Sequence, residues 1–215
     1  MLLSAGSAAA FGQAASASNG GQNQAPPPIK ASSSETDIGV SAYQAMNSST
    51  TANGVTQKPV NAVGGMFEVR HIQSPWIGYE VTYSYNSGKQ TIGPAPAPGC
   101  GIYCPLKPQT LSSVESLVGL DWVVSKQFGS LRPFAAGGVG FLIDEPGRTT
   151  YGVVDVVRPS WLYGGGVDWK FMSHLGIRLQ YRGLIYKVPN LSTLFPAQGV
   201  YTQSREPMGG IFYSF

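Results

Sequence analysis

The chain has 215 residues, a formal net charge of +3 and 12% charged residues, compared with roughly 25% charged residues in ordinary soluble domains. No apolar run approaches the roughly 20 residues of a membrane-spanning helix, which excludes a helical membrane protein. The positive charges are scattered without a basic cluster, so nucleic acid is not an expected partner. The 28 glycines, 16 prolines and 11% aromatic residues fit an all-β chain rich in turns.

The amino-terminal part is expected to lie outside the folded domain. Residues 1–17 combine a short apolar patch with small residues, and Gly12–Ala14 and Ala15–Ala17 are two candidate cleavage sites. We interpret residues 1–17 as a secretory signal peptide that lacks its basic amino-terminal part; an Ala/Ser-rich tail is the alternative. Residues 18–36 are rich in Ser, Gln, Asn and Pro, a composition that predicts a disordered linker. The folded domain is expected over residues 37–215.

Segments with a two-residue period in apolar character recur from Asp37 onward, which is the spacing of β-strands. The predicted strands cover residues 37–46, 60–72, 77–85, 114–124, 134–143, 161–171, 175–187 and 206–215. The first strand is ambiguous, because both of its phases carry apolar residues. The third is the clearest: one phase contains Ile77, Tyr79, Val81, Tyr83 and Tyr85, and the other contains Gly78, Glu80, Thr82 and Ser84.

The predicted strands are apolar and aromatic on one phase and charged on the other. The apolar phases, expected to face outward, include Val63, Phe67, Val118, Leu120, Trp122, Val139, Phe141, Trp161, Trp169 and Leu179. The opposite phases carry nine charged residues, which we expect to form a lumenal charge network: Glu68, Arg70, Glu80, Glu115, Asp121, Asp168, Lys170, Arg178 and Arg182. In the core of a soluble protein these charges would be buried without partners, and each would lower the free energy of unfolding by several kcal/mol, as an order of magnitude. Inside a narrow barrel the charged side chains can pair with one another across the lumen.

The connections between the predicted strands alternate strictly between long and short. Strands can cross a bilayer only as a closed cylinder, because every backbone polar group needs a partner there. An up-and-down barrel in a bacterial outer membrane has long external loops and short periplasmic turns, and an even strand number leaves both termini in the periplasm. The sequence therefore predicts an all-β, eight-stranded antiparallel up-and-down transmembrane β-barrel in this orientation.

The last residues of the chain support this prediction. Gly209, Ile211, Tyr213 and Phe215 share one phase, whereas Phe212 interrupts the other. This ending resembles the terminal strand of bacterial outer-membrane β-barrels, and the resemblance implies that these four residues form a signal for the outer-membrane assembly machinery.

Four segments carry a broader resemblance: Arg132–Phe141, Tyr163–Trp169, Gly176–Gly183 and Gly210–Phe215. They resemble the small outer-membrane β-barrel superfamily that includes the transmembrane domain of outer membrane protein A, and the likeness covers residues 37–215. It implies a non-enzymatic protein without catalytic residues, cofactor or metal. The partners it implies are outer-membrane lipids and the assembly machinery.

Two cysteines and two histidines are the remaining candidates for chemistry. Cys100 and Cys104 lie four residues apart in a Pro/Gly-rich loop, and in an exported protein they are expected to form a local disulfide. His71 and His174 fall at predicted short turns and are expected to be solvated. His71 and Ser74 also invite comparison with lipid A deacylases, although their spacing differs and the pair would lie on the periplasmic side.

Three functions are compatible with these patterns. The first is a monomeric outer-membrane barrel for envelope integrity, surface interaction or minor porin-like permeability, with loops that contact an external ligand or surface. The second is a soluble lipocalin-like barrel, whose apolar phase would face inward around a ligand. The third is a lipid A modifying enzyme in the outer membrane. The first is favoured, because the charged phase needs an interior in which its members can pair.

Overall fold

The computed structural model describes residues 34–52, 55–74, 76–94, 109–147, 155–188 and 200–215. The predicted signal peptide, most of the predicted linker, and Cys100 and Cys104 lie outside the described residues. Among the described residues, no helix is long and apolar enough to cross a membrane.

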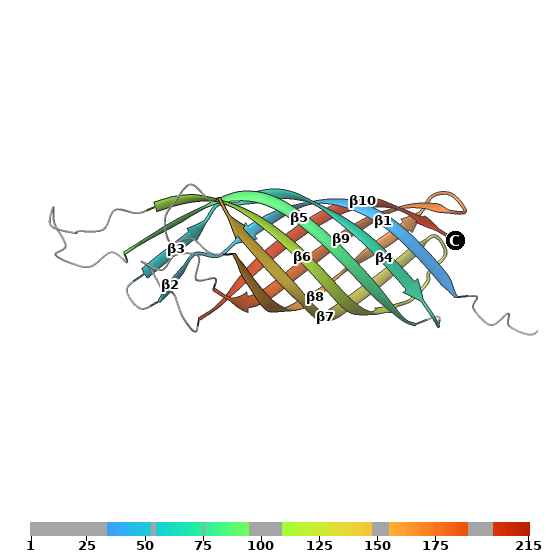
Figure 1. Ribbon diagram of the computed structural model, residues 1–215. Helices are drawn as coiled ribbons and strands as arrows, with labels where there is room; N and C mark the ends of the chain where they lie inside the picture. Colours follow the sequence, from blue (N-terminus) through green and yellow to red (C-terminus); the bar gives the residue numbers. More distant parts are fainter. Residues whose placement is uncertain (1–33, 53–54, 75, 95–108, 148–154, 189–199) are drawn as a thin grey trace, which may run out of the picture. The chain divides into compact units, whose positions relative to one another are not determined.

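Within these described ranges, ten strands form one antiparallel sheet. They are β1 (Glu35–Asn47), β2 (Thr50–Ala52), β3 (Val55–Pro59), β4 (Ala62–Ile72), β5 (Ile77–Pro94), β6 (Gln109–Ser125), β7 (Leu131–Pro146), β8 (Val156–Lys170), β9 (Leu175–Lys187) and β10 (Tyr201–Ser214). β1 and β4 to β10 close a barrel, because β10 pairs with β1 and each other member pairs with its neighbours along the chain. The predicted eight-stranded antiparallel up-and-down barrel is confirmed (Figure 1).

The connections alternate in length as expected. The turns 73–76, 126–130 and 171–174 are short, and the carboxy-terminus lies at their end of the barrel, here called the short-turn end (Figure 1). The opposite end is called the long-loop end. The segment 47–59 was expected to be a loop, but it contains β2 and β3, and β3 pairs with the extension of β5 beyond Asn86. Six of the eight barrel strands are longer than predicted, above all β5 and β6 with 18 and 17 residues, whereas β9 has its predicted bounds and β4 begins two residues later than predicted.

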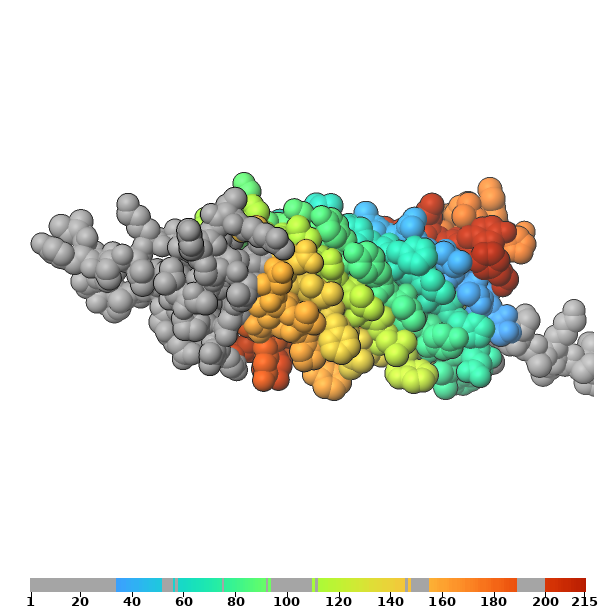
Figure 2. All heavy atoms as spheres, viewed as in Figure 1, coloured from blue at the N-terminus to red at the C-terminus, as the bar shows by residue number. Residues whose placement is uncertain are grey.

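The two faces of the barrel wall have opposite character, as the period predicts. The outward side chains are apolar and exposed, including Val81, Leu120, Val139, Trp161 and Leu179. Figure 2 shows the atoms of successive strands packed side by side over one face of the barrel. The lipocalin-like alternative is therefore wrong, because its apolar phase would have to face inward. The ambiguous phase of β1 is also resolved: Asp37 and Tyr43 are buried inside the barrel, whereas Ile38 and Val40 are exposed.

Exposed aromatic side chains gather towards the two ends of the wall. Those near the short-turn end include Trp76, Tyr79, Trp122, Trp169, Tyr213 and Phe215, and those nearer the long-loop end include Tyr85, Phe141, Trp161, Tyr163 and Tyr201. Aromatic rings of this kind mark the two membrane interfaces in transmembrane barrels. The apolar belt between them matches a hydrocarbon layer.

Candidate functional site

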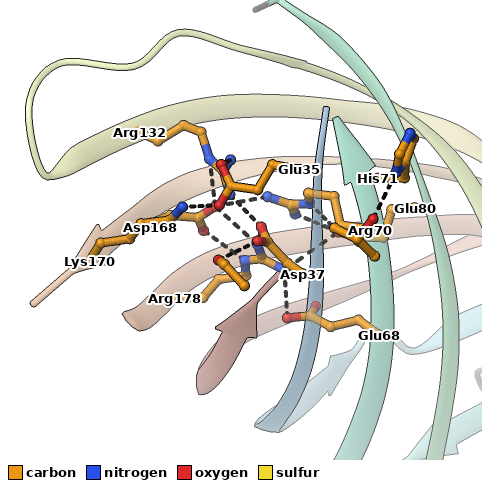
Figure 3. Close-up of polar contacts among 12 residues, drawn as sticks. Glu35, Asp37, Glu68, Arg70, His71, Glu80, Arg132, Asp168, Lys170 and Arg178 are labelled. Carbon is orange, nitrogen blue, oxygen red and sulfur yellow. Dashed lines mark hydrogen bonds and ion pairs between the residues drawn. The ribbon is translucent and has the colours of Figure 1, made fainter. Parts of the chain in front are cut away.

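The interior near the short-turn end holds a dense set of charged side chains that come from six strands. We call it the ion-pair cluster, and it consists of Glu35, Asp37, Glu68, Arg70, Glu80, Arg132, Asp168, Lys170 and Arg178. In Figure 3 these side chains converge from the surrounding wall on one another. All but Glu35 and Lys170 are almost completely buried.

Arg178 on β9 is the centre of this cluster. Its Nε and Nη2 donate to the two oxygens of Asp168 at 2.7 and 3.0 Å, and its Nη1 donates to Glu68 Oε1 at 2.7 Å. The first contact is a bidentate pair, the geometry that makes arginine–carboxylate bonds strong and specific. The second contact crosses the barrel to β4. Arg178 therefore ties strands that are not neighbours in the sheet.

Two further arginines extend the cluster across the lumen. Arg70 on β4 donates to Glu80 at 2.5 Å and to Asp168 at 3.2 Å. Arg132 on β7 donates to Asp37 and Asp168 and, at 3.2 Å, to Glu35, whose other oxygen pairs with Lys170. Asp168 thus accepts from three arginines, so its full negative charge is compensated.

Two aromatic rings pack against the guanidinium groups. The Cζ atom of Arg70 lies 3.9 Å from the centre of the Phe134 ring, and that of Arg178 lies 4.9 Å from the centre of the Phe212 ring. A cation over an aromatic face is attracted by the ring quadrupole. This contact explains why Phe212 interrupts the polar phase of β10, since it faces inward with only 1% of its surface exposed.

A second polar group lies further towards the long-loop end. Arg182 on β9 pairs with Glu206 on β10 at 2.6 Å and donates to Ser84 on β5 at 2.9 Å. Around this group the interior is apolar: Tyr43, Ala45, Ala62, Met66 and Met208 form one buried cluster, and Leu117, Leu142, Leu162, Leu184 and Tyr186 form another.

The ion-pair cluster, the Arg182–Glu206 pair and the two apolar clusters leave little free space inside the barrel. Two cavities beside Glu115 have a volume of about 10 Å³ each, room for a single water molecule. A barrel of eight strands has an interior that side chains just fill. Each of these two cavities is therefore too small for a solute.

The structure brings together seven of the nine predicted lumenal charges. Glu68, Arg70, Glu80, Asp168, Lys170, Arg178 and Arg182 all form ion pairs. Glu115 and Asp121 also lie on the inward phase, but they form no ion pair among the described residues. Glu115 instead accepts a hydrogen bond from Asn86 at 3.1 Å, and Asp121 lies opposite Glu80, another acid.

The sequence interpretation missed four members of the ion-pair network: Glu35, Asp37, Arg132 and Glu206. Each lies at the end of a predicted strand or just beyond it. Extending the two-residue alternation by one step towards the amino-terminus would have identified two of them. Arg132 shares the inward phase with Phe134, and Glu206 shares it with Met208. Glu35 and Asp37 can be recognised as members only once the pairing of β1 with β4 is known, because that pairing places Asp37 opposite Arg70.

The predicted assembly residues lie on the outer face of β10. Ile211, Tyr213 and Phe215 are exposed, and the Tyr213 ring stacks on His174 and meets Phe215 edge to face. Gly209 lies opposite Ala42 on β1 and Leu179 on β9. Their role as an assembly signal stays a prediction.

The two histidines lie at the short-turn end, as the sequence predicts. His71 Nδ1 is 2.8 Å from the hydroxyl of Thr36, and its ring packs on Tyr79. His174 Nδ1 is 2.9 Å from the carbonyl oxygen of Ser214. The Ser74 hydroxyl accepts the backbone N–H of Ile77 at 3.2 Å within its turn, so neither histidine is paired with a serine hydroxyl.

A closed barrel with an apolar, aromatic-banded outer face and a charged interior defines a transmembrane β-barrel. The chain is an eight-stranded barrel of the outer-membrane type, similar to several solved structures. Neisserial surface protein A matches with a TM-score of 0.56 and 11% identity over 84% of this chain and 97% of that one. OprG from Pseudomonas aeruginosa matches with a TM-score of 0.54 and 11% identity over 84% and 95%.

A weaker similarity links the chain to Ail of Yersinia pestis, whose structure is a complex with the heparin analogue sucrose octasulfate. The TM-score is 0.48, with 12% identity over 85% of this chain and 97% of that one. The sequence matches no family model and no curated protein.

Proposed function

We propose that the protein is a non-enzymatic, monomeric barrel of the bacterial outer membrane that is closed to solutes and holds its long-loop end at the cell surface. Its role is then surface interaction or support of the envelope, with permeability at most minor. The observation that carries this proposal is the filled interior, in which the ion-pair cluster and the Arg182–Glu206 pair cross the lumen at two levels.

The absence of enzymatic activity in this proposal rests on how the candidate residues are used. The buried charges compensate one another, and a carboxylate held by three arginines, such as Asp168, is a poor general base. His71 contacts Thr36 instead of a nucleophilic serine. A lipid A modifying activity would need an activated nucleophile on the outer face, and none of these contacts provides one.

The proposed partners follow from the outer surface. Outer-membrane lipids cover the apolar belt, and the assembly machinery binds Gly209, Ile211, Tyr213 and Phe215. At the long-loop end, the exposed cations Lys58, Lys89 and Lys187 favour an external ligand or surface that carries negative charge.

Orientation can be tested in intact cells. Because both termini are proposed to be periplasmic, an epitope inserted within residues 95–108 should bind antibody without permeabilisation. The same epitope in the turn 126–130 should bind only after the outer membrane is opened. The reverse pattern would contradict the proposed orientation.

Conductance in planar bilayers tests whether the barrel is closed. We expect the refolded wild-type protein to give no steady open-channel current. Arg182→Ala, which removes the arginine of the Arg182–Glu206 pair, should alter the conductance or lower the heat stability. Arg205→Ala, an exposed residue of β10, is the matched control and should do neither. A stable conductance step in wild-type protein would overturn the proposal that the lumen is closed.

A further inference from the structure

Two carboxylates in the long-loop half of the interior face each other without a cation between them. Glu115 on β6 and Asp144 on β7 are directly opposite in register, and both lie on the inward phase. Like charges at directly opposed positions of neighbouring strands are destabilising. Neither residue forms an ion pair with any described residue, so the described part of the chain places no cation directly between them.

The nearest basic residue on the neighbouring strand is occupied elsewhere. Arg158 lies inward on β8, diagonal to Asp144, but its Nη1 donates to the carbonyl oxygens of Lys187, at 2.9 Å, and Val188. These carbonyls lie at the end of β9, beyond Tyr186, the last residue of β9 that pairs with β8. Arg158 therefore ties β8 to the end of β9 and acts on Asp144 only from a distance, without forming an ion pair.

The interior as a whole has more acids than bases. Its described inward acids are Glu35, Asp37, Glu68, Glu80, Glu115, Asp121, Asp144, Asp168 and Glu206, and its bases are Arg70, Arg132, Arg158, Lys170, Arg178 and Arg182. Every acid except Glu115, Asp121 and Asp144 belongs to a salt bridge. Two of these three acids, Glu115 and Asp144, are the pair that lies directly opposite in register.

Buried oxygen atoms without hydrogen-bond partners occur on both of these strands and in a cavity beside Glu115. Asp144 is 1% exposed, and its Oδ2 has no hydrogen-bond partner; the same holds for Oγ of Ser113, which is 5% exposed and next to Glu115 on the inward phase. Asn47 Oδ1 is a third such atom. Asn47, Ser113 and Glu115 line one cavity of about 10 Å³, and Glu115 also borders the second. Carboxylate, amide and hydroxyl oxygens are the donors that hard cations prefer.

We propose that the long-loop half of the lumen binds a small divalent cation of the Ca²⁺ or Mg²⁺ class through the carboxylates of Glu115 and Asp144. Ser113 and Asn47 supply neutral oxygen ligands. The site lies on the long-loop side of the Arg182–Glu206 pair and needs no open pore, so it goes beyond the proposed function. A cation here removes the repulsion between β6 and β7 and fixes the rim of the barrel.

Thermal unfolding of the refolded full chain tests the site. Addition of Ca²⁺ or Mg²⁺, against NaCl at equal ionic strength, should raise the midpoint by roughly 5 °C when the cation is in large excess over its dissociation constant. The double variant Glu115→Gln, Asp144→Asn should show no rise. Glu145→Gln is the matched control, because Glu145 is the next residue of β7 but is exposed, and it should respond like wild type.

Terbium luminescence gives a second measurement that does not depend on the double variant folding. Tb³⁺ should bind wild-type protein, be sensitised by Tyr43 and Tyr186, which line the cavity beside Glu115, and be displaced by Ca²⁺. The single variant Glu115→Gln should bind at least tenfold more weakly.

Three results would overturn the proposed cation site: a wild-type midpoint that responds to neither cation, a cation response retained in the double variant, or equal Tb³⁺ binding in Glu115→Gln and wild type. Stabilisation by acid without any response to cations would assign the pair to a shared proton instead. A conducting wild-type barrel would overturn only the closed lumen, because none of these measurements depends on conductance.

Discussion

Replacing Arg178 with alanine is expected to lower the stability of the refolded barrel by about 3–5 kcal/mol, the range measured when one partner of a buried ion pair is removed. The truncation leaves Glu68 and Asp168 without their bonds at 2.7 Å and leaves Phe212 without the cation that covers its ring. Denaturant unfolding in lipid or detergent, followed by the heat-dependent shift of the folded band on a gel, measures the loss.

Two further variants separate charge from position. Arg178→Lys keeps the positive charge but cannot form the bidentate contact with Asp168, so we expect an intermediate loss. Arg205→Ala removes an arginine from the outer face of β10 and should change stability by less than about 1 kcal/mol. If Arg178→Ala were no more harmful than Arg205→Ala, the ion-pair cluster would not be what holds the short-turn end closed.

A charge on the outer wall should have the next largest effect. Leu120 is 49% exposed on β6, between Val81 and Val139 on the neighbouring strands, and so faces the centre of the apolar belt. Leu120→Arg should cost about 2–4 kcal/mol of stability in a bilayer, because an arginine near the midplane must be desolvated or must thin the membrane. Folding yield into vesicles of defined lipid measures this cost.

The same substitution at the edge of the belt is the control. Leu131 begins β7 beside a short turn and is exposed to a similar extent. Leu131→Arg should cost at most about 1 kcal/mol, because an arginine there reaches the interface. Equal costs at the two positions, or equal costs in vesicles and in detergent, would count against the proposed position of the membrane.

The strand phases could be predicted from the sequence because they depend on local alternation. Glu80, Arg178 and Arg182 each lie between apolar residues that point the other way, and a single period places them inside. Where the alternation is broken, the sequence could not show which phase of a strand faces the lumen. In β1 both phases are apolar, and only the pairing of Asp37 with Arg70 in register fixes which phase faces inward.

The partners of the interior charges could not be predicted in the same way. Arg178 meets Glu68, which is 110 residues away in the chain, and this contact depends on the tilt and stagger of the whole barrel. The period also gives a side chain's direction but not its depth. Glu115 and Asp121 face inward as expected, yet neither forms an ion pair among the described residues.

The two-stranded ribbon formed by β5 and β6 extends further towards the long-loop end than the pairing of β5 with β4 does. β4 leaves β5 at Asn86, but β5 and β6 stay paired to Ile92 and Gln109, six residues further, a rise of about 20 Å at roughly 3.3 Å per residue. The free edge of β5 is covered by β3 over this stretch. This two-stranded extension, covered by β3 on its β5 side, carries the described ends of the two strands, Pro94 and Gln109, beyond the part of the wall that β4 completes.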